Sequence, residues 1–495
     1  MTVVVDARED FTLEAFRRVA VDGASVVIGP AAWQVMGAAR AGFEQLLRSD
    51  PHGFIYGVTT RPGVEVGTVI PPEELLSYAR RFRGTGRGFG RDGLDERVVR
   101  GIVFARLADF VGGHAKVRPE LAQRVAALLD RPLPRVPLDG QAGAGEILPL
   151  MHVMAALDAD DLVEGEGMAL LNGSPCATAL VADAALHAGH RLRVAEAIFA
   201  LSIEALGAPL DAYDEALDAL RGDDAERTVL RRLRGHLRGA VTSGRLAHQA
   251  PVSYRIVPQV LGQAQRAEQA VVHAATTALG SVTENPVYLP ASDEHPAGRV
   301  LSTGGFHNGA VAPALDWLTA AWADIALVTQ RQVTAMHSPT SGLPHLLAPP
   351  GFVAGASGGA TNLFGWVATG LVEEARALAA PTLLPATIND TQNDVASPLF
   401  GAYRSQHRAA ECLDSALAIL ALVASQALFV TGRPVAPPLA GLLDGIRSVF
   451  PPVEAAERAD QGRQAEELAS ILSRAALTGR LDFPGDSGQV PLLAP

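Results

Sequence analysis

The feature that most constrains the fold of this chain is a series of long, alanine-rich amphipathic segments in its second half. Apolar residues recur there at the spacing of one helix face, and alanine both favours the helix and allows neighbouring helices to approach closely. The long segments cover residues 262–281, 313–337, 359–380 and 400–430. Shorter segments with the same period lie at residues 13–22, 31–50, 96–113 and 120–130. The pattern predicts a mainly α protein built on a long-helix bundle.

Strand signals are few and lie outside these segments. VVIGP at residues 26–30 is one, and RVLSTG at 299–304 is expected to form a small hairpin with VYLP at 287–290. We therefore expect a smaller N-terminal α+β region over residues 1–200 and a helical-bundle core over residues 201–495.

Composition excludes several classes of protein. The 495 residues carry a formal net charge of −12, which disfavours nucleic acid or an anionic membrane as a partner. The two cysteines, Cys176 and Cys412, form no metal-binding spacing, so we expect no metal and a reducing compartment. MTVVVDARED does not resemble a signal peptide, and we predict a cytoplasmic protein.

One segment is apolar enough to suggest a membrane. ALAILALVASQALFVTG, residues 416–432, is shorter than the roughly 20 residues that a span needs and contains Ser425 and Gln426. It is therefore predicted to be a buried core helix.

Two kinds of cofactor chemistry are disfavoured. Lys116 is the only lysine of the chain and lies in the loop-like GGHAKVRPE, a poor place for a Schiff base. RGTGRGFG, residues 83–90, follows no buried strand and has no GK[ST], so it is a weak nucleotide signal.

Five polar, loop-like segments carry the functional signal. They are YGVTTRPG (56–63), GQAGAGEILPLMH (140–152), LLNGSP (170–175), HQAPVSYRIVPQVLG (248–262) and ENPVYL…STGGFHNGA (284–310). In order and spacing they resemble the histidine/phenylalanine ammonia-lyase family over nearly the whole chain. The resemblance implies a mostly helical homotetramer whose active sites are shared between subunits.

The resemblance also implies a prosthetic group that this sequence lacks the residue to make. Family members cyclise an Ala-Ser-Gly stretch and dehydrate the serine to methylidene-imidazolone. Anchoring on Pro149, Leu150 and His152 places Gly143-Ala144-Gly145 there, and residues 140–152 contain no Ser, Thr or Cys. Alanine has no β-leaving group, so we expect no methylidene-imidazolone and no other cofactor. The glycines suit a sharply bent loop, and Glu146 is expected at a helix N-terminus.

Other positions of the resemblance divide into matches and departures. Six residues match the family's loop tyrosine, pocket asparagine, glutamine, carboxylate-binding arginine, aromatic and histidine: Tyr56, Asn172, Gln249, Arg255, Phe306 and His307. Six positions depart from the family pattern: Thr59, Arg61, Arg81, Val252, Gly305 and Asn393. Val252 stands at a catalytic tyrosine and Asn393 at a glutamate, so the losses fall on the amine-elimination machinery.

These residues predict an enzyme that moves protons on a small carboxylate. Tyr56 is the main acid/base candidate, with His307 as a second catalytic candidate. The predicted substrate-binding residues are Arg255, Arg61, Arg81, Thr59, Asn172, Gln249, Phe306, Val252 and Asn393. The three arginines favour a substrate more anionic than a plain amino acid.

Less specific interpretations of the same residues stay open. Tyr56 and His307 also suit structural roles, and Arg81 suits a solvated charged face. At the level of the protein, the alternatives are a non-catalytic binding protein or pseudoenzyme, and an ordinary imidazolone-type ammonia-lyase or aminomutase.

Overall fold

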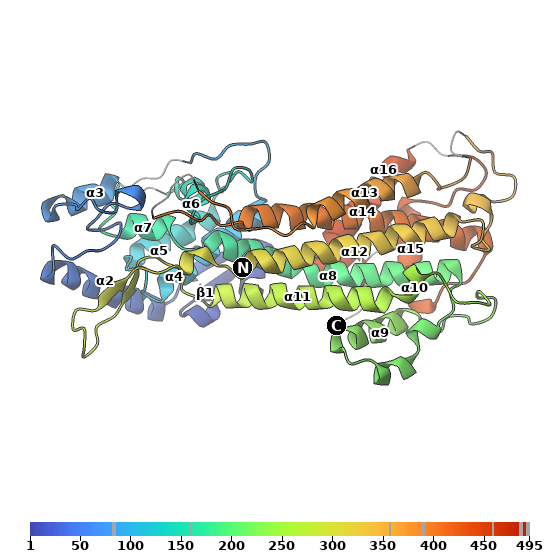
Figure 1. Ribbon diagram of the computed structural model, residues 1–495, viewed down its shortest axis with the longest axis horizontal. Helices are drawn as coiled ribbons and strands as arrows, with labels where there is room; N and C mark the ends of the chain where they lie inside the picture. Colours follow the sequence, from blue (N-terminus) through green and yellow to red (C-terminus); the bar gives the residue numbers. More distant parts are fainter. Residues whose placement is uncertain are drawn as a thin grey trace. The chain divides into compact units, whose positions relative to one another are not determined.

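A computed structural model describes most of the chain as two compact units (Figure 1). The described residues are 1–81, 86–157, 160–355, 358–387, 392–457, 460–484 and 489–491. Unit 1 comprises Met1–Ala184, Val271–Leu315 and Pro381–Arg404, and unit 2 comprises Ala185–Ala270, Asp316–Ala380 and Ser405–Pro495. Each unit thus combines three chain segments, whereas the sequence suggested one boundary near residue 200.

Three of the four longest helices match predicted long segments, α8 was not predicted, and each of the four contributes residues to both units. They are α8 (Pro175–Leu206), α11 (Val257–Leu279), α12 (Val311–His337) and α14 (Leu399–Thr431). The prediction of a mainly α, long-helix protein is confirmed.

Unit 1 contains the mixed α and β part. Strand β1 (Thr2–Val5) pairs in parallel with β2 (Ser25–Ile28), and β3 (Val287–Leu289) pairs antiparallel with β4 (Arg299–Leu301), as the hairpin prediction required. The helices wholly within unit 1 are α1 (Leu13–Ala20), α2 (Pro30–Ser49), α3 (Leu75–Arg81), α4 (Glu96–Val111), α5 (Pro119–Ala126), α6 (Ile147–Met154) and α7 (Glu166–Leu171).

Helix α4 forms the centre of unit 1. All its residues from Val98 onward are buried, and it contacts α1, α2 and α5. A helix that is enclosed all round needs apolar or paired side chains on every face, which explains why Arg106 and Asp109 of α4 form an ion pair.

Unit 2 is helical apart from one short strand pair, β5 (Arg480–Asp482) with β6 (Gln489–Pro491). The helices wholly within it are α9 (Asp224–His236), α10 (Val252–Arg255), α13 (Phe364–Leu378), α15 (Ala440–Val449) and α16 (Gln461–Thr478).

Helix α14 confirms the prediction of a buried core helix. Residues 416–428 are all buried, and the Gln426 side chain donates to the Leu347 and Val453 carbonyls at 3.1 and 3.0 Å and accepts from the Val453 amide at 2.9 Å. By length and composition, three helical stretches of the described chain are apolar enough to cross a membrane: Glu166–Leu206, Gly305–His337 and Leu399–Thr431. In α14 this apolar character lies inside the protein, because 83% of its most apolar window is buried.

Candidate active site

The loop at Gly143-Ala144-Gly145 is the centre of the candidate site in unit 1. The Gly143 carbonyl accepts a hydrogen bond from the Ser397 amide at 2.8 Å. A Cβ at Gly145 would lie 3.4 Å from the Phe306 ring and 4.0 Å from Asn172 Oδ1, so both side chains border the loop. Of the glycines in this segment only Gly140 has a positive φ, 68°. The backbone bends at residues 138–140 and again at 143–146, so the predicted bent loop includes the Gly-Ala-Gly triplet, which adopts it without a positive φ.

Glu146 follows this loop and ties it to helix α8. Its carboxyl oxygens accept from the backbone amides of Cys176 and Ala177 at 2.5 and 2.7 Å. Glu146 stands at the N-cap position of α6, as the sequence predicted, but its side chain caps the N-terminus of α8 instead. Burial raises the pKa of Glu146 to about 8, against the opposing effect of the two amides. A carboxyl group that is neutral near pH 7 thus lies directly behind the loop.

Asn172 is held rigidly beside the loop. Its Nδ2 donates to the Asn285 carbonyl at 2.7 Å and its Oδ1 accepts from the Gly173 amide at 2.9 Å. Arg106 donates to the Asn172 carbonyl. The amide group keeps one N–H and one lone pair for a ligand.

A buried ionic group lies around Arg106, and it could not be predicted from the sequence because its members are far apart along the chain. Arg106 pairs with Asp109 and lies 3.6 Å from Glu284. Lys116 is fully buried and donates to the Pro286 carbonyl at 2.8 Å. Burial raises the pKa of Glu284 to about 7 and lowers the pKa of Lys116. Lys116 is therefore enclosed, which agrees with its exclusion as a Schiff-base lysine.

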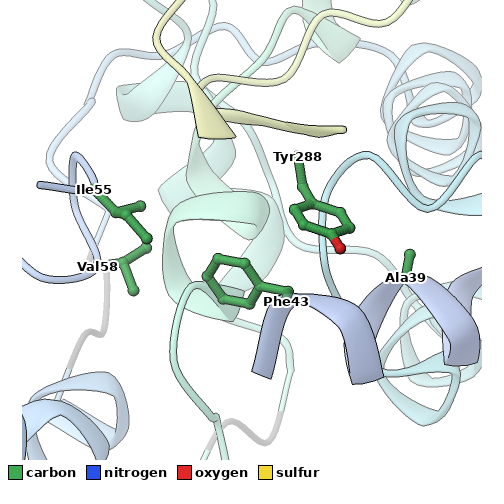
Figure 2. Close-up of a cluster of buried hydrophobic side chains, with 5 residues drawn as sticks. All are labelled: Ala39, Phe43, Ile55, Val58 and Tyr288. Carbon is green, nitrogen blue, oxygen red and sulfur yellow. The ribbon is translucent and has the colours of Figure 1, made fainter. Parts of the chain in front are cut away.

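Tyr56 lies in a loop that a small apolar cluster anchors. Its neighbours Ile55 and Val58 pack with Ala39, Phe43 and Tyr288, as Figure 2 shows. The half-buried Tyr56 hydroxyl accepts a hydrogen bond from the Gly63 amide at 2.8 Å. This bond fills an acceptor position of the oxygen and leaves the hydroxyl proton available for a ligand.

Asn393 is brought to the same loop from a distant part of the chain. A Cβ at Gly63 would lie 3.4 Å from Asn393 Nδ2, and Ser397 four residues later holds Gly143. The segment 392–397 therefore connects the Tyr56 loop with the Gly-Ala-Gly loop.

Three residues of this region that were predicted to bind substrate have side chains that bond to other residues of the protein. The buried Thr59 hydroxyl donates to the Gly53 carbonyl and accepts from the Ile55 amide, both at 2.7 Å, which gives it a role inside its own loop. Arg61 pairs with Glu65 at 3.1 Å, with both side chains about half exposed. Arg81 is exposed and donates to Ser77 at 3.4 Å.

Phe306 and His307 lie in one 3-10 turn, Gly305–His307, which follows β4 and its connecting loop along the chain. Phe306 contacts the Gly145 region as described above. His307 Nε2 is buried and has no hydrogen-bond partner in the described part of the chain. A buried imidazole nitrogen of this kind is available to a ligand.

The remaining predicted residues line a pocket of unit 2. Gln249, Val252 and Arg255 belong to one wall, and a face of α12 forms the other. The pocket has a volume of about 780 Å³. Arg255 Nε donates to the Ala250 carbonyl at 2.9 Å, which orients the guanidinium group while Nη1 and Nη2 stay available. Gln249 and Val252 are exposed at the pocket rim.

Comparison with known proteins identifies the family. The model of the family described as aromatic amino acid lyase matches residues 11–164 and 154–448, and the chain belongs to this family of enzymes. The histidine ammonia-lyase of Symbiobacterium thermophilum is 30% identical over 91% of this chain and 93% of its own length. That of Geobacillus thermodenitrificans is 29% identical over 97% and 99%.

Solved structures share the fold. A tyrosine aminomutase from Streptomyces globisporus has a TM-score of 0.82 at 24% identity, covering 97% of this chain and 98% of its own. Histidine ammonia-lyase from Trypanosoma cruzi has a TM-score of 0.81 at 24% identity, covering 96% and 94%. The family resemblance predicted from five short motifs is thus confirmed.

Proposed function

We propose that this chain is an ammonia-lyase-like enzyme that acts on a small carboxylate without the methylidene-imidazolone group. Elimination, isomerisation and cyclisation are the reaction types that acid/base chemistry allows. One observation carries the proposal: Ala144 occupies the loop that Phe306 and Asn172 border, where the family's group requires a hydroxymethyl side chain. The residues present do not fit that group, since a methyl side chain cannot lose water.

The residues of unit 1 supply the proposed chemistry. Tyr56 transfers a proton, because its hydroxyl hydrogen is free while the Gly63 amide holds its oxygen. His307 is the second proton-transfer candidate. Asn172 and Asn393 donate hydrogen bonds to the substrate, and the Phe306 ring covers one side of the Gly-Ala-Gly loop.

Arg255 binds the carboxylate in this proposal. A guanidinium group whose Nε is already held presents its two terminal nitrogens as a preoriented fork, which suits bidentate binding of a carboxylate. Gln249 adds a hydrogen bond at the rim. The curated relatives named histidine ammonia-lyase support a small carboxylate as the substrate class.

Intact mass spectrometry tests whether the methylidene-imidazolone group is absent. The denatured chain is expected to have the mass of its 495 residues. A mass lower by about two water molecules, with the absorbance of the imidazolone, would instead establish the imidazolone-type enzyme. In the same preparation, histidine, phenylalanine and tyrosine are expected to release neither urocanate nor cinnamates.

Proton transfer is measured by deuterium incorporation. The protein is incubated with a panel of small carboxylates in D₂O, and the carbon-bound hydrogens are followed by mass spectrometry. We expect exchange or turnover of one member, and a loss of roughly 100-fold or more in Tyr56→Phe. Tyr78→Phe, on α3 beside the same loop, is the matched comparison and is expected to lose much less activity than Tyr56→Phe. No exchange or turnover with any carboxylate would favour the non-catalytic binding protein.

We further propose a cytoplasmic homotetramer in which different subunits contribute to one site. The support is the family resemblance, which implies active sites shared between subunits. Light scattering measures the oligomer. Mixing inactive Tyr56→Phe and Arg255→Gln chains during refolding is expected to restore part of the activity, whereas each variant mixed with itself stays inactive. A monomer with full activity contradicts this part of the proposal.

A further inference from the structure

We propose that the pocket of unit 2 binds a ligand with two anionic groups, one held by Arg255 and the other by Arg331. The inference rests on the proposed function, because it specifies the substrate class of the same carboxylate-binding residue. Arg331 was not among the residues predicted from the sequence.

The pocket has the charge that such a ligand requires. Arg255, Arg331 and His248 line it, and none of its described lining residues is Asp or Glu. This is unusual in a chain with a formal net charge of −12. A concave site that gathers cations without neutralising carboxylates attracts anions.

The two arginines come from different helices. Arg255 ends the short helix α10, and Arg331 lies on α12. On α12, Leu327, Arg331 and Thr334 follow each other at helical spacing and line the pocket, and Ser338 lines it directly after the helix. The Gln332 side chain donates to the Ser253 carbonyl at 2.8 Å and joins α12 to α10. This bond ties together the two helices that carry the arginines.

Both guanidinium groups are available to a ligand. In the described part of the chain, Arg331 forms no ion pair, and the one hydrogen bond of Arg255 uses Nε. This distinguishes them from Arg61, which pairs with Glu65. The sequence predicted a substrate more anionic than a plain amino acid, and Arg331 is the residue proposed to bind its additional negative charge.

Hydroxyl groups beside Arg331 complete the polar wall. Thr334, Ser338 and Thr340 line the pocket, and the Ser338 and Thr340 hydroxyls lie 2.9 Å apart. Hydroxyls and arginines together are a common set of donors for carboxylate and phosphate oxygens. The volume of about 780 Å³ accommodates a small dianion with room to spare.

The test compares dicarboxylates with monocarboxylates of equal length on the intact protein. Malonate, succinate, glutarate and adipate are titrated by calorimetry beside propionate, butyrate, valerate and hexanoate. We expect one dicarboxylate to bind about tenfold or more tightly than its monocarboxylate partner. Arg331→Gln is expected to abolish this ratio while leaving monocarboxylate binding unchanged. Arg331→Lys, which keeps the charge but loses the fork, is expected to retain part of it.

Controls separate this inference from the proposed function. Arg376→Gln removes an exposed arginine of α13 and is expected to change nothing. If Arg255→Gln leaves monocarboxylate binding intact, the proposed role of Arg255 fails. If Arg255→Gln weakens binding but Arg331→Gln leaves the ratio unchanged, or changes only the oligomeric state, the two-anion inference alone is overturned.

Discussion

Replacing Glu146 by glutamine tests the electrostatics directly behind the Gly-Ala-Gly loop. The carboxyl group is enclosed and caps α8 through the Cys176 and Ala177 amides. Burial raises its pKa from 4.5 to about 8, so the folded protein holds a proton that the unfolded chain has lost over this pH range. The group therefore lowers the free energy of unfolding progressively as the pH rises from 4.5 to 8. Glutamine stays neutral and removes this dependence.

The size of the effect follows from the same values. Each pH unit between the unfolded and folded pKa values costs about 1.36 kcal/mol. Between pH 5 and pH 8 the stability of the wild type is thus expected to fall by about 3 kcal/mol relative to Glu146→Gln. Buried Glu284 also has a raised pKa, but it is present in both the wild type and Glu146→Gln. Its effect on the free energy of unfolding therefore cancels when the two are compared.

Denaturant unfolding followed by circular dichroism at pH 5, 6, 7 and 8 measures the difference. Glu120→Gln, an exposed first-turn position of α5, is the matched control and should give a flat difference. The reasoning is refuted if Glu146→Gln destabilises the protein equally at all four pH values. That result would mean that the two backbone amides of α8 keep the carboxylate ionised.

Three further substitutions test the packing around the site and the core. Arg106→Met leaves buried Asp109 without its paired cation and Glu284 with Lys116 alone, and should reduce the free energy of unfolding by about 3–5 kcal/mol in urea titrations; an unchanged midpoint contradicts this. Gln426→Leu leaves the Val453 amide unpaired and should cost about 1–3 kcal/mol by the same assay. Gly57→Ala places a Cβ 2.5 Å from Met168 at a φ of 67°, so it should lower the melting temperature and slow deuterium exchange through Tyr56. Full exchange at an unchanged melting temperature would show that the loop adapts.

Much of the fold was predictable because helical periodicity is a local property. The apolar spacing at residues 313–337 and 400–430 anticipated α12 and α14 within a few residues. The hairpin of β3 and β4 was also predicted. Strand β1 was missed, although its TVVV carries the same β-branched strand signal as the predicted β2.

The residues of the candidate site could be predicted from the sequence, but the hydrogen bonds and ion pairs of their side chains could not. Motif order brought together Tyr56, Asn172 and Phe306, and the structure places Phe306 and Asn172 beside Gly145. No motif predicted that Arg61 pairs with Glu65 or that Thr59 bonds inside its own loop. Hydrogen-bond partners depend on side-chain orientation, which residue type alone does not specify.

The sequence by itself determined the helical architecture, the family and the absence of a hydroxyl side chain from residues 140–152. These follow from residue identity and short-range spacing. Only the tertiary structure decided that Glu146 caps a helix 30 residues away, that Lys116 is enclosed, and that Arg331 lines the pocket of Arg255. Burial and charge environment are set by segments distant in the chain, so they become visible only once the chain is folded.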